Sequence, residues 1–423
     1  MSKNMSTRMK PSGIEWIGDI PDGWDIKRIR FATLLRTEKG IYNPNKDIYI
    51  GLENVESSTG KLVQTESEYE EGFYDIFHKE DVLFGLLRPY LEKVFIAKFN
   101  GFCTGEFLIL REYQGDKRYL FYFLLSHGFL EIVNASTYGA KMPRASWDYI
   151  RNLTILVFPI HEQQAIASFL DKQCEKINGI IADMEQQIEV LKQYKTALIT
   201  EIVTKGLDKS ALMNDSGIDW IGKIPAHWEV KPIKYSLLSN EKALKETTRD
   251  DYVIRYIDIG SVDFDNGITR YEEINFENAP SRARRVVKKG DTIISTVRTY
   301  LKAIARIVDD KDVIVSTGFA VFSPQKNDPI FVEYFCKSEG FCSEIEKFSY
   351  GIAYPAINES VLINIKIILP PIKEQKIIAS YLDTKCKEIT NIINDKQSSI
   401  STMNDYKKSL IYEYVTGKKR VTI

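Results

Sequence analysis

The sequence predicts an α+β protein in which two similar globular α/β domains are separated by two long helices, paired as an antiparallel intramolecular coiled coil. Three observations predict this fold: two heptad-patterned stretches, a tandem duplication of the chain around them, and short β-type runs inside each copy. Two copies of one module are expected to be related by a pseudo-two-fold axis, with the helices at its centre. The predicted parts are a first globular domain (1–158), a first helix (159–206), a second globular domain (207–369) and a second helix (370–423).

The long helices are predicted by apolar residues that recur every seven positions in two interleaved rows. Such rows are the a and d positions of a coiled coil. Pro159 precedes the first stretch and Gly206 follows it, which is typical of helix borders. The pattern returns 212 positions later. The residues predicted to pair the two helices are Leu170, Ile177, Ile181, Met184, Ile188, Leu191 and Leu198 in the first, and Leu382, Ile389, Ile393, Ile400, Met403 and Leu410 in the second.

A helix with a single apolar seam is not stable alone in water, so each seam requires a partner. The alternative is that each helix packs separately on a globular domain, but five heptads exceed what one domain face requires. The direction of pairing is indicated by two lysines in the rows. A parallel pair would set Lys195 level with Lys407, whereas an antiparallel pair separates these like charges, which favours the antiparallel arrangement.

The duplication extends through the globular parts. Residues 12–24 return as residues 216–228, and the tryptophans in this opening segment are best explained as anchors that hold it to its domain. Short β-type runs follow in both copies, then a helical segment, a loop and a final strand that leads into the long helix. The sequence therefore predicts the order domain, helix, domain, helix.

Composition indicates a soluble globular protein of two or three domains, since 44% of the 423 residues are hydrophobic and 27% are charged. Apolar runs are too short to span a membrane, and the polar N-terminus does not resemble a secretory signal. The five cysteines are odd in number and lack a CxxC pair, which favours reduced thiols in a cytoplasmic protein. The four histidines have no metal-ligand spacing, so no metal site is expected.

Catalytic motifs are missing from the sequence. It contains no GxxxxGK[ST] phosphate loop, no GxGxxG after a strand and no GxSxG elbow. Its one Pro-Pro pair lies between Leu369 and Ile372, which does not fit the Asn/Asp-Pro-Pro-aromatic turn of adenine methyltransferases. We therefore expect a protein without catalytic activity.

Binding chemistry is better represented. The net charge of −1 means that any basic surface is local, and one basic run extends from Arg282 to Lys289. The turn from Arg88 to Leu91 returns at residues 298–301 and places an arginine beside a tyrosine. Arginine can bond guanine or phosphate and tyrosine can bond phosphate or stack on a base. The alternatives are an internal salt bridge with a core tyrosine for the turn, and a solvated face for the basic run.

A loop near residue 140 carries the sharper signal. Its frame is shared between the copies as Tyr138 and Gly139, but the side chains that follow differ: Lys141, Met142 and Arg144 in the first copy, and Ala353, Tyr354 and Ala356 in the second. A common loop shape with different side chains is what two readers of different DNA sequences require. The alternative is two solvated loops that have diverged freely.

Taken together, the paired SGI(E/D)WIGxIP opening, LRPYLxK, YGAKMPRxxW and PIxEQxxIAxxLD resemble the specificity subunit of type I restriction–modification systems over nearly the whole chain. The resemblance implies two target-recognition domains, each reading one half of a split, asymmetric double-stranded DNA site. It also implies that the helices set the distance between them and dock two modification subunits. It implies no cofactor in this chain, with S-adenosylmethionine, ATP and magnesium expected on the modification subunits and on further restriction–translocation subunits.

The resemblance assigns DNA binding to motif positions in both domains, and the basic run and the second loop add four residues. The resulting candidates are Arg88, Tyr90, Lys93, Tyr138, Gly139, Lys141 and Arg144 in the first domain, and Arg282, Arg284, Arg285, Arg298, Tyr300, Lys302, Tyr350, Gly351 and Tyr354 in the second. The second domain departs from the motif at Thr299, Ala353 and Ala356. The competing hypotheses are a coiled-coil assembly scaffold that does not bind DNA and an enzyme with an unrecognised site.

Overall fold

The computed structural model describes residues 8–309 and 313–421, and the chain divides into two compact units. Unit 1 comprises Met1–Met184 together with Gln397–Ile423, and unit 2 is the continuous stretch Glu185–Lys396. The two long helices, α5 (Ile160–Lys205) and α9 (Ile372–Val415), each contribute one segment to each unit. Each unit is described below by itself.

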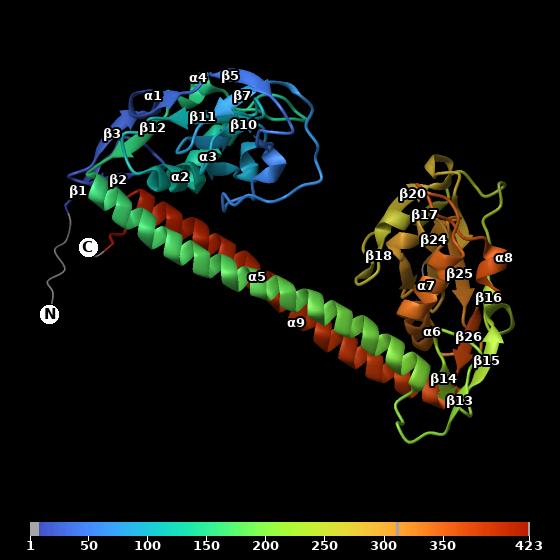
Figure 1. Ribbon diagram of the computed structural model, residues 1–423. Coiled ribbons are helices and arrows are strands. Elements are labelled where there is room, and N and C mark those ends of the chain that lie inside the picture. The colour runs from blue at the N-terminus through green and yellow to red at the C-terminus, as the bar shows by residue number, and fades with distance from the viewer. Residues whose placement is uncertain (1–7, 310–312, 422–423) are drawn as a thin grey trace. The chain divides into compact units, whose positions relative to one another are not determined.

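Unit 1 places two four-stranded sheets beside short helices (Figure 1). In the described residues one sheet has the order β4-β11-β8-β9 and the other β5-β7-β10-β6. The elements that precede α5 are β1 (Met9–Pro11), β2 (Asp19–Pro21), β3 (Asp25–Arg28), α1 (Ile29–Ala32), β4 (Leu34–Leu35), β5 (Lys39–Tyr42), β6 (Tyr49–Ile50), η1 (Leu52–Asn54), β7 (Gly72–Phe77), β8 (Val82–Gly85), η2 (Pro89–Leu91), β9 (Val94–Ile96), β10 (Gly101–Cys103), β11 (Phe107–Arg111), α2 (Lys117–Leu125), α3 (His127–Ala135), α4 (Trp147–Ile150) and β12 (Thr154–Val157).

Strand β8 lies between two apolar clusters and is buried along its whole length. Val82 and Phe84 belong to the cluster that includes α2 and α3, whereas Leu83 belongs to the cluster shared with β7 and β9. Successive side chains of a strand point to opposite faces, so a continuous apolar run fills both clusters at once.

Unit 2 repeats this architecture. Its sheet β16-β25-β22-β23 has the same order and antiparallel pairing as β4-β11-β8-β9. The elements are β13 (Met213–Asp215), β14 (Lys223–Pro225), β15 (Glu229–Pro232), η3 (Ile233–Tyr235), β16 (Leu238–Ser239), β17 (Val253–Ile257), η4 (Ile259–Ser261), β18 (Val262–Asp263), β19 (Gly267–Ile268), β20 (Glu272–Asn275), η5 (Phe276–Asn278), β21 (Ala283–Val286), β22 (Thr292–Ser295), η6 (Thr299–Leu301), β23 (Ile304–Arg306), β24 (Val313–Ser316), β25 (Phe319–Ser323), α6 (Pro329–Cys336), α7 (Glu339–Lys347), α8 (Glu359–Leu362) and β26 (Lys366–Leu369).

The second sheets of the two units differ at their edges. Both contain one parallel pair, β10–β6 in unit 1 and β24–β17 in unit 2. Unit 1 adds β5 beside β7, whereas unit 2 adds β20 beside β17 and keeps only an isolated bridge, Ala243 to Arg285, at the position of β5. The duplicated fold is therefore confirmed, with different strands at the outer edge of each unit.

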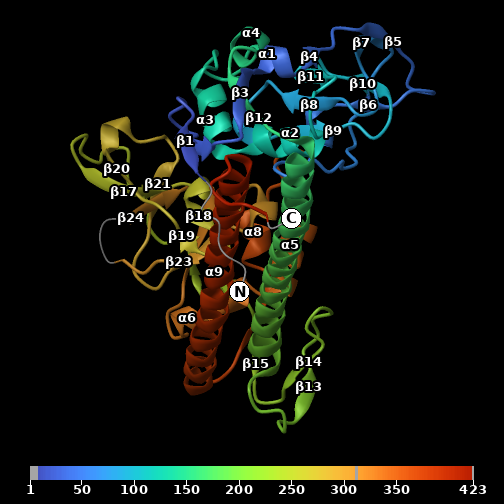
Figure 2. The same ribbon diagram turned by 90° about the vertical axis from the view of Figure 1, so that its left-hand side faces the viewer.

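The segments of α5 and α9 pair in antiparallel fashion within each unit, as predicted (Figures 1 and 2). In unit 1, the rings of Phe169 and Tyr414 lie 4.4 Å apart and the Lys407 Nζ donates to Asn178 Oδ1 at 3.0 Å. In unit 2, Lys396 Nζ donates to Gln187 Oε1 at 2.6 Å. The residues predicted to pair the helices are buried (Leu170, Ile177, Ile188, Leu198, Leu382, Ile389, Ile393, Leu410) or half-buried (Ile181, Met184, Leu191, Ile400, Met403).

The opening segments are tied to the starts of the long helices. In unit 1, the Trp24 Nε1–H donates to Glu162 Oε2 at 3.2 Å. In unit 2, the equivalent Trp228 donates to Glu374 Oε1 at 3.1 Å. Each tryptophan therefore bonds a carboxylate in the first turn of a helix, where the dipole also favours negative charge.

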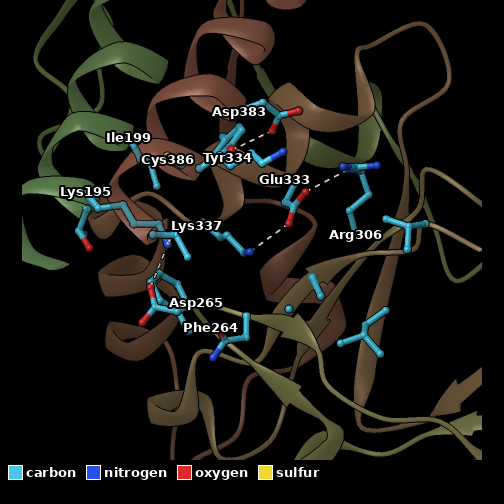
Figure 3. Close-up of a pocket in the computed structure, with 18 of the residues that line it drawn as sticks. Lys195, Ile199, Phe264, Asp265, Arg306, Glu333, Tyr334, Lys337, Asp383 and Cys386 are labelled. Atoms are coloured by element: carbon cyan, nitrogen blue, oxygen red, sulfur yellow. Dashed lines mark hydrogen bonds and ion pairs between the residues drawn. The ribbon is translucent and has the colours of Figure 1, made fainter. Parts of the chain in front are cut away.

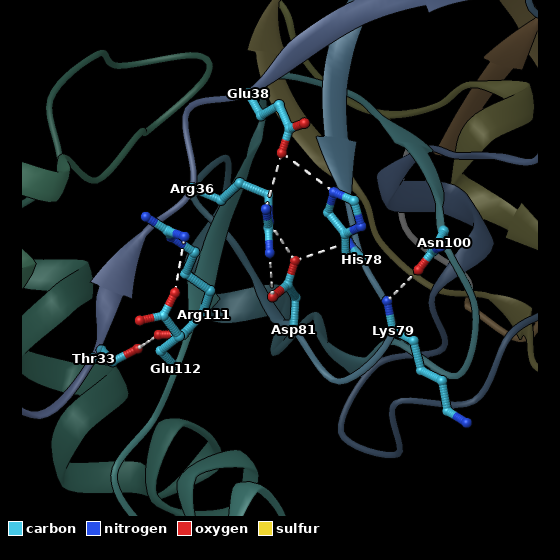
Figure 4. A network of polar contacts seen from close by, with 9 residues as sticks. All are labelled: Thr33, Arg36, Glu38, His78, Lys79, Asp81, Asn100, Arg111 and Glu112. Carbon is cyan, nitrogen blue, oxygen red and sulfur yellow. Dashed lines mark hydrogen bonds and ion pairs between the residues drawn. The ribbon is translucent and has the colours of Figure 1, made fainter.

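A polar network fixes the turn between β7 and β8 in unit 1 (Figure 4). The Arg36 guanidinium donates to Asp81 at 2.7 Å and to Glu38 at 2.9 Å, and the Asp81 carboxylate also accepts from the backbone N–H of His78. Hydrogen bonds from the His78 ring and from Arg36 lower the pKa of Glu38. Asp81 is almost fully enclosed, so its charge requires these donors.

Within residues 8–309 and 313–421, no helix is long and apolar enough to cross a lipid bilayer.

Candidate nucleic-acid interface

The turn that carries the arginine–tyrosine pair has the same unusual backbone in both units. Arg88 and Glu92 flank η2 with φ of 50° and 54°, and Arg298 and Lys302 flank η6 with φ of 52° and 46°. The left-handed region costs a residue other than glycine about 1–3 kcal/mol, and such strain concentrates at functional sites. The same strained backbone occurs at both ends of this turn in both units, so the turn is a candidate functional feature of each unit.

The tyrosine of each turn points outward. Tyr90 is 53% exposed and Tyr300 is 54% exposed, so neither is a core residue. Arg88 is half-buried, whereas Arg298 is exposed. An exposed tyrosine held on a constrained turn can stack on a base or donate to a phosphate.

The loop near residue 140 packs directly against this turn, so two motifs that lie far apart in the sequence form one surface. In unit 1, the Arg88 N–H donates to the carbonyl of Pro143 at 2.7 Å, and Tyr138 pairs with Arg144 across the loop. Tyr138, Gly139 and Lys141 are exposed, and Gly139 takes a φ of 93° that closes the loop.

Unit 2 has a similar arrangement, in which the donor of the turn lies one residue later than in unit 1. The Thr299 N–H donates to the carbonyl of Pro355 at 3.4 Å, and Tyr350 pairs with Ala356. Tyr350, Gly351 and Tyr354 are exposed, and Gly351 has a φ of 106°. The two loops therefore share a backbone and present different side chains.

Two candidate cations of unit 1 have partners inside the protein. Arg144 forms an ion pair with Glu106 at 2.7 Å and also donates to the carbonyl of Gly105 at 2.8 Å. The Lys93 Nζ donates to the carbonyl of Val55, and burial lowers the pKa of this lysine. Lys141 is the cation of this loop that the structure leaves at the surface.

Lys141→Ala and Arg144→Ala are expected to differ in their effects. Lys141→Ala should weaken DNA binding with little change in stability, because its side chain is exposed. Arg144→Ala should lower the unfolding free energy by roughly 1–3 kcal/mol, because it leaves the carboxylate of Glu106 without its partner. Urea unfolding and DNA titrations of both variants check this; equal loss of stability in both would contradict it.

In unit 2, a cavity of about 470 Å³ joins residues from three separate parts of the chain. Arg282 comes from the start of the basic run, Arg298 from the turn and Tyr354 from the loop. The Arg298 guanidinium lies 5.0 Å from the centre of the Tyr354 ring, in cation–π contact. A stacked arginine at the edge of a cavity keeps its outer donors available for a base edge or a phosphate.

Other candidate residues of unit 2 contact partners within the protein. The Arg284 guanidinium lies 4.7 Å above the ring of Phe276. Arg285 lies 3.7 Å from Glu359, and burial lowers its pKa. Lys302 lies 3.7 Å from Glu346. The arginines of the basic run therefore point to different places: Arg282 lines the cavity, whereas Arg284 and Arg285 contact other side chains of the protein.

The cavity also contains residues that sequence reasoning missed. Tyr256 and Asp258, at the end of β17 and the start of η4, line it together with Ser316. The repeated tyrosine was the available signal, because Tyr49 occupies the equivalent position in unit 1. There, the ring of Tyr69 covers it at 4.1 Å between ring centres.

Among the residues that the structure describes, no group of three or more His, Cys, Asp or Glu side chains could hold a metal ion. The constellation of arginine, tyrosine and carboxylate at the cavity can donate to and accept from base edges and phosphates.

Comparison with known proteins identifies the family of the chain. The model of the type I restriction modification DNA specificity domain matches residues 25–190 and again residues 225–402. The MjaVIII specificity subunit of Methanocaldococcus jannaschii is 29% identical over 423 residues, which cover 95% of this chain and 94% of that protein. The EcoBI specificity subunit of Escherichia coli is 22% identical over 327 residues, covering 73% of this chain and 67% of that protein.

Two solved structures share the fold. A chain from a type I restriction–modification system has a TM-score of 0.71 at 16% identity, covering 95% of this chain and 99% of that one. The HsdS subunit of Thermoanaerobacter tengcongensis has a TM-score of 0.51 at 17% identity, covering 95% and 98%. The family model matches once in each half of the duplicated chain, over well over half of its length. This chain therefore belongs to the family of type I restriction–modification DNA specificity proteins.

Proposed function

We propose that each unit reads one half of a bipartite, asymmetric DNA site, and that the paired α5 and α9 set the unread gap between the halves. The observation that carries this proposal is the pair of turn-and-loop surfaces, which share a backbone and differ in their side chains. Two units with the same loop backbone and different loop side chains suit the recognition of two different half-sites. Phosphate contacts would hold the register, and a few side chains in each unit would read base edges.

The proposal assigns a second role to the helices, which is to dock two modification subunits. Apolar side chains remain exposed on the helix surface, namely Ile180 and Tyr406 in unit 1, and Val190, Tyr194, Ile377 and Ile392 in unit 2. Docking of the modification subunits along the helices would bury these side chains. The chain itself would be non-catalytic, and the partners would supply S-adenosylmethionine, ATP and magnesium in the cytoplasm.

Lengthening α5 tests the role of the helices. Insertion of one helical turn between Thr204 and Lys205 should change the gap and leave both half-sites unchanged. The Lys205 Nζ donates to the carbonyl of Ile221 at 2.6 Å, so the last turn should carry the opening segment of unit 2 with it. Methylome sequencing of cells that express the chain with its modification partner measures gap and half-sites together.

The same insertion placed in the connection at residues 208–211, outside the helix, is the matched control and should leave the gap unchanged. Altered half-sites with an unchanged gap in the helix variant would contradict the proposal. Salt-independent or undetectable DNA binding by the assembled complex would favour the scaffold hypothesis instead.

A further inference from the structure

A lysine in the apolar seam of unit 2 connects its own helix to two other parts of the chain. Lys195 belongs to α5, and its side chain is 12% exposed. Its Nζ lies 3.3 Å from Asp265 Oδ1 and also donates to Thr390 Oγ1 of α9 at 3.3 Å. Asp265 is at the tip of the β18–β19 hairpin of the second reader, where its backbone N–H donates to Asp263. One ammonium group thus joins both helices to the reader.

The contact borders a cavity lined by both charged and apolar side chains. This cavity of about 500 Å³ lies between the hairpin, α6 and the two helices (Figure 3). Its walls include Glu333, which pairs with Arg306 at 3.0 Å and with Lys337 at 3.0 Å. Val262 and Ile268 pack the base of the hairpin into an apolar cluster of the domain, whereas its tip reaches the helices beside this cavity, where Asp265 meets Lys195.

Unit 1 closes the equivalent region with apolar packing. Phe121 occupies the position of Glu333 in the repeat and is buried. A Cβ added to Gly60 would lie 2.6 Å from the Phe121 ring and 2.7 Å from the carbonyl oxygen of Val94, so the turn is pressed against the domain. At this position, unit 1 has an aromatic contact, whereas unit 2 has the polar contact of Lys195 with Asp265.

In unit 1, two neighbouring lysines of α9 share the roles that Lys195 has alone in unit 2, one contacting the other helix and one contacting the globular domain. The Lys407 Nζ donates to Asn178 of the partner helix at 3.0 Å, and the neighbouring Lys408 lies 3.6 Å from Glu92 at the end of the reader's turn. Burial lowers the pKa of Lys407, which shows that its charge is disfavoured in the seam. A polar group at such a position fixes geometry at a cost in stability.

We propose that Lys195 is a positioning residue that fixes the orientation of the second reader on the helix pair, and thereby the register in which this reader meets DNA. The proposal rests on the proposed function for its consequence in DNA recognition. The contact itself stands on the geometry of Lys195, Asp265 and Thr390.

Lys195→Met is the decisive variant, because methionine keeps the length of the side chain and suits the seam. Its melting temperature should equal or exceed that of the wild type. Discrimination between the correct gap and gaps that differ by one base pair should fall roughly tenfold, since small misplacements have large effects on reactivity. The first half-site should be unaffected. Asp265→Asn, which leaves the seam intact, should reproduce the loss of discrimination.

Lys396→Met is the matched control. This lysine also interrupts the seam, but it bonds Gln187 of the partner helix. The control should gain stability like Lys195→Met and keep its gap discrimination. Unchanged discrimination in Lys195→Met and Asp265→Asn would overturn the proposal, as would an equal loss in Lys396→Met.

A readout without DNA separates this inference from the proposed function. Amide hydrogen exchange of the β18–β19 hairpin should be faster in Lys195→Met than in the wild type and unchanged in Lys396→Met. Faster exchange together with a wild-type complex that does not methylate split sites would overturn the proposed function and leave the contact standing. Unchanged exchange would overturn the positioning role.

Discussion

Trp24→Ala is expected to lower the unfolding free energy of unit 1 by about 3–5 kcal/mol, the usual cost of removing a large buried aromatic side chain. Trp24 is 1% exposed, and its ring stacks on Phe158 with 3.6 Å between ring centres. The variant also removes the donor to Glu162 at the start of α5. Urea unfolding followed by residue-resolved hydrogen exchange measures the loss and assigns it to unit 1.

Trp228→Ala is the matched variant in unit 2, because this tryptophan makes the equivalent bond to Glu374. It should destabilise unit 2 and leave the exchange protection of unit 1 largely intact, since the two residues belong to different units. If either variant lowered the protection of both units equally, the two-unit description would be wrong. A loss below 1 kcal/mol in Trp24→Ala would show that the site collapses around the missing ring.

Arg298→Ala is expected to reduce discrimination at one base position of the second half-site by about 1–3 kcal/mol, the usual contribution of a bidentate arginine contact. Arg298 is held by the left-handed backbone of its turn and by the Tyr354 ring, so its guanidinium is pre-positioned at the cavity. Arg298→Lys should keep the charge and still lose discrimination, because an ammonium group lacks the two-pronged geometry. Methylation of a DNA library randomised at both half-sites measures the effect.

Arg284→Ala provides the control for Arg298→Ala, because the Arg284 guanidinium lies over Phe276 instead of at the cavity. This variant should leave base preference unchanged. A uniform fall in methylation of all sequences by Arg298→Ala, with no change in base preference, would reassign Arg298 to phosphate contact.

The long helices could be predicted closely from the sequence, because a heptad pattern depends on local spacing alone. The first was expected over 159–206 and forms Ile160–Lys205. The second forms Ile372–Val415, within the stretch 370–423 expected for it. Helix α9 ends before residue 423 because Gly417 takes a φ of 74°, which a helix cannot continue through. A Cβ at Gly417 would lie 2.6 Å from the side chain of Pro21. That contact joins opposite ends of the chain, which no local pattern can reveal.

The motifs of the candidate site could be found in the sequence, but the ion-pair partners of its arginines could not. The shared Tyr and Gly predicted a common loop shape, which the structure has in both units. The partner of Arg144 is Glu106, which lies 38 positions earlier, and the partner of Arg285 is Glu359. Whether an arginine faces a carboxylate or solvent depends on tertiary packing. Asp258 was missed for the same reason, because only the fold brings it to Arg298.

The return of α9 to unit 1 has a consequence for how the protein is made. Leu410, Ile411 and Val415 complete the apolar core of unit 1, and the Tyr119 hydroxyl donates to the Val415 carbonyl at 2.9 Å. Unit 2 is continuous in sequence, so it can finish folding on the ribosome while the earlier half still lacks part of its interior. A nascent chain that stops before residue 397 would leave the first half with exposed apolar surface, the kind of surface that chaperones and proteases recognise.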